Sequence, residues 1–286
     1  MKSSLSILFL SILAMHGFSQ PNSKKFNEGS SGYAPTEKTI FYKLGDRNIP
    51  IRVFQYGEVK NVICVSLHSN EITSVQAAMA VLSSKGGTLI KIENGDQRVI
   101  RFPFRGNIYE FDPNRIFSRI GIKETLEENG RSSPEAIDEI EKFTQRILIL
   151  LPKKPSCIIA LHNNTDEAYS VKSYLPGGER KYEAKAVYAD SLQDADDIAY
   201  TTDSLLFQKM AKNRFNAIWQ DNINACRDGS LSVYCGEKNI RYINIETEHG
   251  KLEQYADMLE KLLSILADEN KSTDGFPRGV KQRPMD

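Results

Sequence analysis

The sequence predicts an α/β protein with a mainly parallel, mixed sheet that is covered by helices on both faces. Apolar, strand-like segments alternate with amphipathic, helix-like segments along most of the chain. The strand-like segments are continuous apolar runs, which are typical of strands buried on both faces. In such sheets ligands bind beyond the carboxyl ends of the strands. Polar residues that follow these runs are therefore candidates for a functional site.

The elements follow from the local patterns in chain order. Continuous apolar or β-branched runs predict strands at residues 49–57, 61–67, 156–161 and 241–246. Residues 87–94 and 97–106 are expected to form strands or strand-like turns. Apolar residues at helical spacing predict helices at residues 74–84, 133–151, 203–215 and 251–269. The helix at 133–151 has the clearest start, because Ser133 is a good N-cap and Pro134 suits the first helical position.

The two ends of the chain differ from the middle. Residues 1–19 hold one lysine, an apolar run and small residues before a plausible cleavage point, as in a secretory signal peptide. The apolar run is shorter than the roughly 20 residues that span a bilayer. We expect an exported protein, periplasmic or secreted, without a membrane span after signal cleavage. Residues 20–38 are expected to form a flexible polar leader, 39–270 a single domain and 271–286 a polar tail.

Composition excludes some functions and leaves the cysteines open. The chain has 37 basic and 37 acidic residues, so it lacks the basic excess of a nucleic-acid-binding protein. Cys64 and Cys157 lie in apolar runs and are expected to be buried thiols. Cys226 and Cys235 are close enough in sequence to form a disulfide after export, or to remain free. No CxxC pair supports a thiolate zinc site.

Three potential metal ligands stand where buried strands are expected to end. His68 follows the run at 61–67, Glu71 comes three residues later, and His162 follows the run at 156–161. Two imidazoles and one carboxylate can hold a zinc ion and leave a fourth position for water. The alternative is structural, with Glu71 favouring the first turn of a helix and both histidines hydrogen-bonded in the core.

Further polar residues suit the chemistry of a hydrolase. Glu246 ends the strand expected at 241–246, where a carboxylate can act as a general base toward water. Glu248 points to the same side of an extended chain and remains the alternative. Arg105, Asn114 and Arg115 lie in a stretch punctuated by Gly and Pro, and guanidinium groups bind carboxylates through two hydrogen bonds.

Two long polar stretches carry no recognisable motif. Residues 162–178 begin at His162 and are expected to line a pocket there, and residues 219–239 have the composition of a lid or specificity loop. Each stretch can equally be a surface connection.

The order of these residues resembles the zinc carboxypeptidase superfamily. This superfamily includes the carboxypeptidase A-like metallopeptidases and the branch of aspartoacylase and succinylglutamate desuccinylase. Residues 112–117, DPNRIF, are similar to an Asp-x-Asn-Arg-x-Phe motif of its small bacterial and deacylase members. The resemblance spans residues 50–265 and rests on five elements in order: His68, Glu71, Asn114-Arg115 within the DPNRIF motif, His162 and Glu246. It implies a zinc carboxypeptidase-like fold and one Zn²⁺ ion on His68, Glu71 and His162.

The resemblance also implies roles for other residues. Asn114 and Arg115 would bind the terminal carboxylate of the substrate, and Glu246 would be the general base. Arg105 is the candidate that polarises the scissile carbonyl, although its distance from Asn114 along the chain is unusual for the superfamily. Tyr234, with Tyr174 as an alternative, is the candidate for a loop tyrosine near the leaving group.

We therefore expect an exported zinc metallocarboxypeptidase that cleaves an amide bond next to a free carboxylate, for example in cell-wall peptides. An N-acyl amino acid deacylase is the alternative, and a catalytically inactive binding protein is a second one. The signal peptide favours the peptidase, whereas the short separation of Glu71 and His162 favours the deacylase. Mn²⁺ and Co²⁺ share such ligands with Zn²⁺.

Overall fold

The computed structural model describes residues 32–151, 157–165 and 169–274. The expected signal peptide and most of the leader lie outside these residues, so both stay predictions. Within the described part of the chain, no helix combines the length and the apolar character that a membrane span requires.

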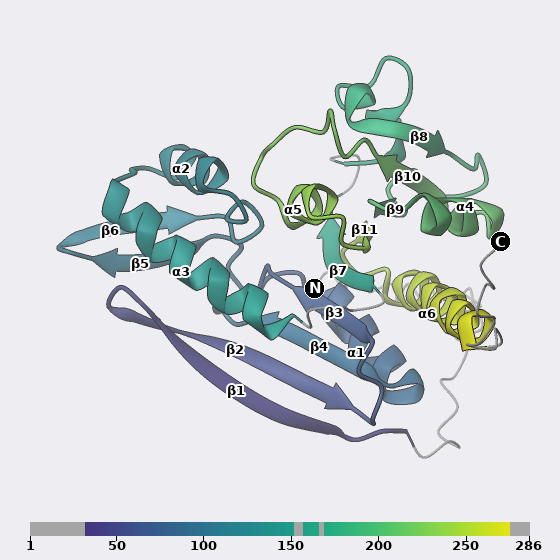
Figure 1. Ribbon diagram of the computed structural model, residues 1–286, viewed down its shortest axis with the longest axis horizontal. Coiled ribbons are helices and arrows are strands. Elements are labelled where there is room, and N and C mark those ends of the chain that lie inside the picture. The colour runs from purple at the N-terminus through teal and green to yellow at the C-terminus, as the bar shows by residue number, and fades with distance from the viewer. Residues whose placement is uncertain (1–31, 152–156, 166–168, 275–286) are drawn as a thin grey trace, which may run out of the picture. The chain divides into compact units, whose positions relative to one another are not determined.

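The centre of the fold is a nine-stranded sheet in which four adjacent strands run parallel (Figure 1). These four are β4 (Gly87–Ile92), β3 (Val62–Ser66), β7 (Cys157–Asn164) and β11 (Tyr242–Glu248). On one side the sheet continues antiparallel through β2 (Arg47–Tyr56) and β1 (Pro35–Leu44). On the other side it continues through β9 (Ile198–Thr201), β10 (Asn216–Gln220) and β8 (Ala184–Tyr188). The predicted mixed α/β sheet is confirmed.

Helices cover both faces of the sheet because the central strands are apolar on both sides. Along β7, Ile158 and Ala160 face one hydrophobic core, whereas Ile159 and Leu161 face the other. The first core includes side chains of α2 (Arg119–Glu128), α3 (Pro134–Leu150) and α5 (Leu231–Glu237). The second includes side chains of α1 (Ile72–Lys85), α4 (Ser204–Lys212) and α6 (Leu252–Asp274). Two short 3-10 helices, Val171–Tyr174 and Lys181–Glu183, lie between β7 and β8.

Several elements depart from their expected limits. The expected strand at 97–106 forms a separate hairpin, in which β5 (Ile100–Phe104) pairs with β6 (Asn107–Phe111). The first strand begins at Pro35, inside the expected leader, and the last helix extends to Asp274, inside the expected tail. Cys226 and Cys235 are both free, so the disulfide that the sequence left open is not formed.

The strands that carry the candidate residues are longer than their apolar runs. β7 and β11 stay paired through Glu246 with His162, Thr247 with Asn163, and Glu248 with Asn164. The backbone ladder therefore continues past the last apolar residue, because peptide groups pair whatever side chains they carry. The helix starts are closer to expectation: Ser133 caps α3 by accepting from the Ala136 N–H.

Candidate metal centre and active-site pocket

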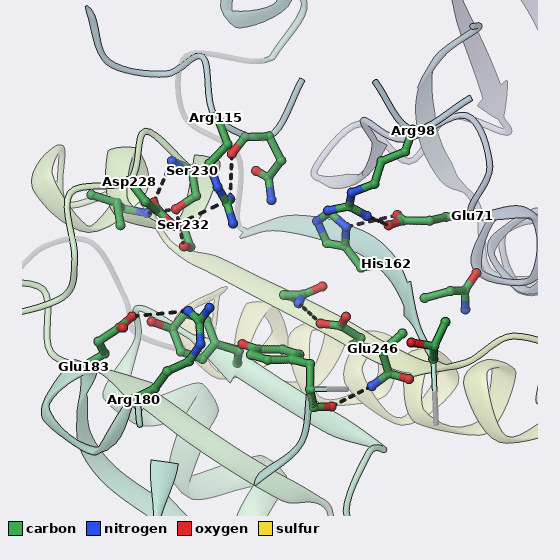
Figure 2. A pocket seen from close by; sticks show the side chains of 18 of the residues that line it. Glu71, Arg98, Arg115, His162, Arg180, Glu183, Asp228, Ser230, Ser232 and Glu246 are labelled. Carbon is green, nitrogen blue, oxygen red and sulfur yellow. Dashed lines mark hydrogen bonds and ion pairs between the residues drawn. The ribbon is translucent and has the colours of Figure 1, made fainter. Parts of the chain in front are cut away.

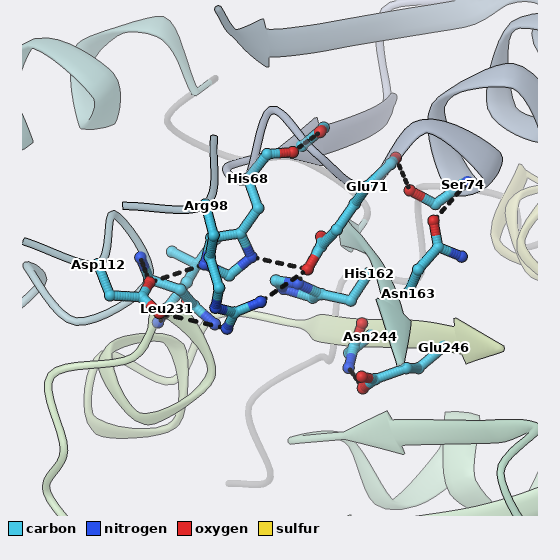
Figure 3. A network of polar contacts seen from close by, with 12 residues as sticks. His68, Glu71, Ser74, Arg98, Asp112, His162, Asn163, Leu231, Asn244 and Glu246 are labelled. Atoms are coloured by element: carbon cyan, nitrogen blue, oxygen red, sulfur yellow. Dashed lines mark hydrogen bonds and ion pairs between the residues drawn. The ribbon is translucent and has the colours of Figure 1, made fainter. Parts of the chain in front are cut away.

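The three candidate ligands meet at the carboxyl ends of the neighbouring strands β3 and β7. His68 lies two residues after β3, Glu71 is the residue before α1, and His162 lies on β7. The Nδ1 atom of His68 is 2.8 Å from Glu71 Oε1, and the Nδ1 atom of His162 is 3.0 Å from Glu71 Oε2 (Figure 3). One ligand atom of each residue lies within 4.8 Å of the others, and all three residues are buried.

The contacts fit a shared cation better than the structural alternative. Glu71 occupies the N-cap position of α1, yet its side chain makes no capping hydrogen bond. The Oε2 atom of Glu71 is buried and has no hydrogen-bond partner within the described ranges, although the His162 ring lies next to it. Burial alone would raise the pKa of Glu71, but the charges of His162 and His68 hold it well below its usual range. A buried carboxylate facing two imidazole nitrogens matches the donor set of catalytic zinc sites.

Asp112 orients His68 from the side away from Glu71. The His68 Nε2 atom is 2.7 Å from Asp112 Oδ1, and the Asp112 backbone N–H donates to Thr125 Oγ1. Burial opposes the charged imidazole, but the carboxylates of Glu71 and Asp112 raise the pKa of His68 to about 9. A carboxylate on one ring nitrogen leaves the other nitrogen available to a metal, as in other metalloproteins. Asp112 belongs to the DPNRIF motif, but its role was not predicted from the sequence.

Arg98 joins the same cluster and was missed by the sequence analysis. Its Nη1 atom lies 3.1 Å from Glu71 Oε1, and its Nη2 atom lies 3.2 Å from Asp112 Oδ2 (Figure 3). The side chain is half-exposed and lines the pocket beside Glu71. Arg98 precedes a strand that belongs to a separate hairpin, so no strand end of the main sheet marked it as a candidate.

A pocket of about 480 Å³ opens beside the cluster, and β11 forms its floor. Alternate residues of this strand, Tyr242, Asn244 and Glu246, line the pocket, as the period of a strand requires. Glu246 is buried, and its Oε2 atom accepts a hydrogen bond of 2.9 Å from Asn244 Nδ2. Burial raises the pKa of Glu246, His162 opposes this shift, and Glu71 adds to it.

Of the two candidate bases, only Glu246 is a pocket residue. Glu248 lies beyond it on β11, and its carboxylate is 3.1 Å from the Lys251 ammonium group. The structure thus separates two carboxylates that the sequence placed on the same side of one strand.

Asn114 and Arg115 also line the pocket, on the loop after β6. Asn114 Oδ1 accepts from the Leu231 N–H at 3.1 Å, and the Arg115 guanidinium donates to the Asn114 carbonyl at 3.0 Å. Arg115 also lies 3.5 Å from Asp228 (Figure 2). Both residues are therefore fixed by contacts with the segment that leads into α5.

Two sequence-based assignments need correction. Arg105 lies in the β5–β6 turn with φ of 50°, is exposed, and pairs with Glu135 at 3.5 Å rather than lining the pocket. Tyr234 lies on α5 with its ring 6.0 Å from that of Phe117, and it does not line the pocket either. The alternative, Tyr174, is a pocket residue, and its hydroxyl is 2.5 Å from that of Tyr169.

Comparisons with known proteins give structural neighbours but no sequence match. No family model and no curated protein matches the chain. An aspartoacylase family protein from Mesorhizobium loti is 14% identical with a TM-score of 0.42, over 85% of this chain and 69% of that one. The murein-tripeptide amidase MpaA from Escherichia coli O157 is 13% identical with a TM-score of 0.45, over 85% and 96%. Thrombin activatable fibrinolysis inhibitor is 12% identical with a TM-score of 0.45, over 82% and 72%.

The aspartoacylase branch of the expected resemblance is represented among these structures. Because the identities and TM-scores are low, the case for an activity depends on the residues of the pocket.

Proposed function

We propose that the protein is a zinc-dependent hydrolase that cleaves an amide bond next to a free carboxylate, in the first place a carboxypeptidase acting on peptides. The observation that carries this proposal is the convergence of His68, Glu71 and His162 on one wall of a pocket that also presents Glu246 and Arg115. A metal centre, a buried carboxylate and a cation for the substrate are the parts that such a hydrolysis requires.

His68, Glu71 and His162 would hold the metal ion. When bound there, Zn²⁺ supplies Lewis acidity and lowers the pKa of a bound water to about 7. Asp112 would keep the Nδ1 atom of His68 directed at the ion.

Glu246 is the group that would move the proton. Its carboxylate takes a proton from the attacking water and returns it to the leaving amine nitrogen. The hydrogen bond from Asn244 holds the Oε2 atom, which leaves the other oxygen for this transfer. The raised pKa of Glu246 favours the step, because a base with a higher pKa accepts a proton more readily.

Arginine side chains would orient the substrate and stabilise charge. Arg115 can bind the terminal carboxylate through two hydrogen bonds. Since the Asn114 Oδ1 atom is occupied by the Leu231 N–H, its NH₂ group is available to the same carboxylate. Arg98 lies against Glu71 and can donate to the carbonyl oxygen as negative charge develops on it. This role replaces the one that the sequence assigned to Arg105.

The substrate can be tested with matched compounds on the chain without residues 1–19, loaded with Zn²⁺. We expect release of the last amino acid from peptides with a free carboxylate and not from the same peptides amidated at that end. Elemental analysis should find about one zinc per chain, and a His162→Ala variant should retain much less, with Glu248→Gln as the control. If the zinc-loaded chain hydrolyses neither peptides nor N-acyl amino acids, the proposal is wrong.

The same panel separates the alternatives. Cleavage of N-acyl amino acids but not peptides would identify a deacylase, for which the same residues serve. Peptide binding without turnover, unchanged in a Glu246→Gln variant, would identify an inactive binding protein. Export to the periplasm or the medium, with cell-wall peptides as candidate substrates, is proposed from residues 1–19 alone.

A further inference from the structure

The pocket extends beyond Arg115 to a charged wall formed by Arg180, Glu183 and Asp228 (Figure 2). Arg180 and Glu183 belong to the segment around the second 3-10 helix, whereas Asp228 lies in the segment before α5. None of the three takes a step in the proposed hydrolysis, although Asp228 pairs with Arg115. We call these three residues the charged wall.

The ion pairs of the charged wall are long. Arg180 Nη1 lies 3.7 Å from Glu183 Oε2, and Arg115 Nη1 lies 3.5 Å from Asp228 Oδ2. Close pairs between a cation and a carboxylate measure about 2.7–2.9 Å. The Oδ1 atom of Asp228 accepts from the Ser230 N–H at 2.9 Å. Among the described residues, the Oδ2 atom of Asp228 and the Oε2 atom of Glu183 have only these long ion pairs, so they can accept another donor.

Glu183 and Asp228 repel each other, and Glu183 is partly buried. Burial raises the pKa of Glu183, Arg180 and Arg115 oppose the shift, and the Asp228 charge adds to it. Without substrate, Arg115 and Arg180 face Glu183 and Asp228, and the nearby Glu179 adds a further negative charge to the same pocket. Once a substrate carboxylate takes up the charge of Arg115, only Arg180 remains against Glu183 and Asp228. The charged wall then has one negative charge in excess.

The floor beside the charged wall offers an acceptor that nothing uses. Asn244 is buried and donates to Glu246 through Nδ2, but its Oδ1 atom has no partner in the part of the chain that the structure describes. Buried polar atoms are nearly always hydrogen-bonded, so this acceptor can take a donor from a water or from a ligand in the pocket. Tyr174, Tyr200 and Tyr242 complete this region with ring surface suited to an aliphatic stem.

We propose that the charged wall selects substrates whose C-terminal residue has a side chain ending in an ammonium group, such as lysine or ornithine. This inference rests on the proposed function, because it takes Arg115 as the group that binds the terminal carboxylate. The ammonium group would lie between Glu183 and Asp228, where it supplies the missing charge and hydrogen-bond donors. Arg180 stays beside Glu183, with its guanidinium 5.6 Å from the ring centre of Tyr169.

The first experiment compares three peptides that differ only in the last residue, which is lysine, norleucine or glutamate. Lysine and norleucine share the aliphatic stem and differ in the ammonium group. We expect kcat/KM for the lysine peptide to exceed that for the norleucine peptide by about tenfold or more, with the glutamate peptide slowest. Equal rates for lysine and norleucine, or a preference for glutamate, would overturn the inference.

Variants locate the source of the preference. Glu183→Gln and Asp228→Asn should each reduce the lysine-to-norleucine ratio several-fold, whereas Glu127→Gln should keep it. Glu127 is the matched control, because it is an exposed carboxylate on α2 paired with Lys123 outside the pocket. Thermal unfolding establishes that each variant is folded. A ratio that stays the same in both folded pocket variants would contradict the assignment to the charged wall.

A binding measurement keeps the inference separate from the proposed function. Isothermal calorimetry on the zinc-loaded wild-type chain compares free lysine with free norleucine, so it requires neither turnover nor a variant. Tighter binding of lysine without cleavage of any peptide would support the pocket inference and refute the peptidase. Cleavage of peptides without any preference in rate or binding would support the peptidase and refute the pocket inference.

Discussion

Replacing Asp112 with Asn tests how the candidate metal centre is held together. The Oδ1 atom of Asp112 faces His68 Nε2 at 2.7 Å and accepts from the Asn114 N–H at 2.7 Å. The Oδ2 atom faces the Arg98 guanidinium at 3.2 Å. An asparagine must place its NH₂ group at one of these two positions. In either orientation that group meets donors, because His68, Asn114 and Arg98 all present N–H groups there.

The expected loss follows from these contacts. Loss of an outer partner of a metal-binding histidine typically weakens metal affinity about 10–100-fold. At about 1.36 kcal/mol per factor of ten, this corresponds to about 1.4–2.7 kcal/mol. We expect the upper part of this range, because the His68 side chain is 0% exposed and no water can replace the lost acceptor. The variant should fold, since asparagine has nearly the same shape as aspartate.

The assay is a zinc titration in competition with a chelator of known affinity, on the wild type, Asp112→Asn and Asp138→Asn. Asp138 is the matched control, because it is an exposed carboxylate on α3 that pairs with Arg119. We expect wild-type affinity in the control and weaker binding in Asp112→Asn at equal helical circular dichroism. An affinity of folded Asp112→Asn within about twofold of the wild type would refute the role of Asp112.

Three further variants test the general base Glu246, the packing of Gly121 against Gly229, and the buried carboxylate of Asp197. Glu246→Gln should lower kcat by about 10²–10⁴-fold and Glu248→Gln should not, as initial rates would show. Gly121→Ala would place a Cβ atom 2.5 Å from the Gly229 Cα atom, and should lower the free energy of unfolding in urea by about 1–3 kcal/mol. Burial raises the pKa of Asp197 from 3.8 to about 6, so the folded chain binds a proton that the unfolded chain has released between these values. The free energy of unfolding therefore falls as the pH rises through this window. Asparagine carries no charge, so Asp197→Asn should raise the free energy of unfolding by up to about 3 kcal/mol more at pH about 8 than at pH about 4.

Each of these predictions has a result that would contradict it. Equally slow turnover in the two glutamate variants would remove the distinction between Glu246 and Glu248. If Gly121→Ala has the same free energy of unfolding as the wild type, the backbone at Gly229 can move to admit the Cβ atom without loss of stability. If Asp197→Asn changes stability equally at both pH values, the buried carboxylate is not the group that titrates.

The sequence located residues whose position follows from the sheet itself. His68, His162 and Glu246 were found because each follows or extends an apolar run, and parallel strands present their carboxyl ends at one edge. The sequence did not predict which strands are neighbours. This order was not needed to group His68, His162 and Glu246, because all three strands were expected in one parallel sheet. The fold class was predicted for the same reason, since continuous apolar runs require cover on both faces.

Arg98 and Arg105 show where this reasoning fails. They lie on either side of β5, and only the pairing of that strand decides which arginine reaches the pocket. Phe104 pairs with Asn107, so Arg105 lies in a two-residue turn at the end of the hairpin, where the tight connection favours a positive φ at both turn residues. Arg98 precedes the hairpin and so stays near Asp112, which follows it. The pairing of a small separate sheet is tertiary information that local patterns do not contain.

Tyr234 fails for a related reason, because the direction of a helical side chain depends on which face of the helix is buried. Leu231 and Cys235 face the core from α5, and Val233 lines the pocket. Tyr234 is then directed to Phe117.

Of the charged wall, only Asp228 lies in a stretch that carried no motif, 219–239, whereas Arg180 and Glu183 follow the other stretch, 162–178. The sequence indicated a pocket lining there but not which charges would meet.

Two polar side chains, Tyr255 and Asn163, hold the residues of the candidate centre in position without being candidate metal ligands. The Tyr255 hydroxyl from α6 accepts from the His162 backbone N–H and donates to the Ile245 carbonyl at 2.7 Å. Asn163 accepts from the Ser74 N–H at the start of α1 and donates to the Thr247 carbonyl of β11. These two side chains tie together the three segments that bear Glu71, His162 and Glu246.

Tethers of this kind matter because a catalytic arrangement must hold its groups to within about 0.5 Å. Tyr255→Phe keeps the ring in its buried place and removes only the hydroxyl. Because no cavity forms, Tyr255→Phe should lower the free energy of unfolding less than a change to a small residue would. It should still allow the distance between His162 and Glu246 to vary more, at the ends of β7 and β11. We expect lower kcat and a smaller loss of zinc affinity, because the backbone of His162 depends on this bond, whereas the ligand atoms of His68 and Glu71 do not. Wild-type kcat in a folded Tyr255→Phe variant would show that the β7–β11 backbone ladder alone is sufficient to hold the pair.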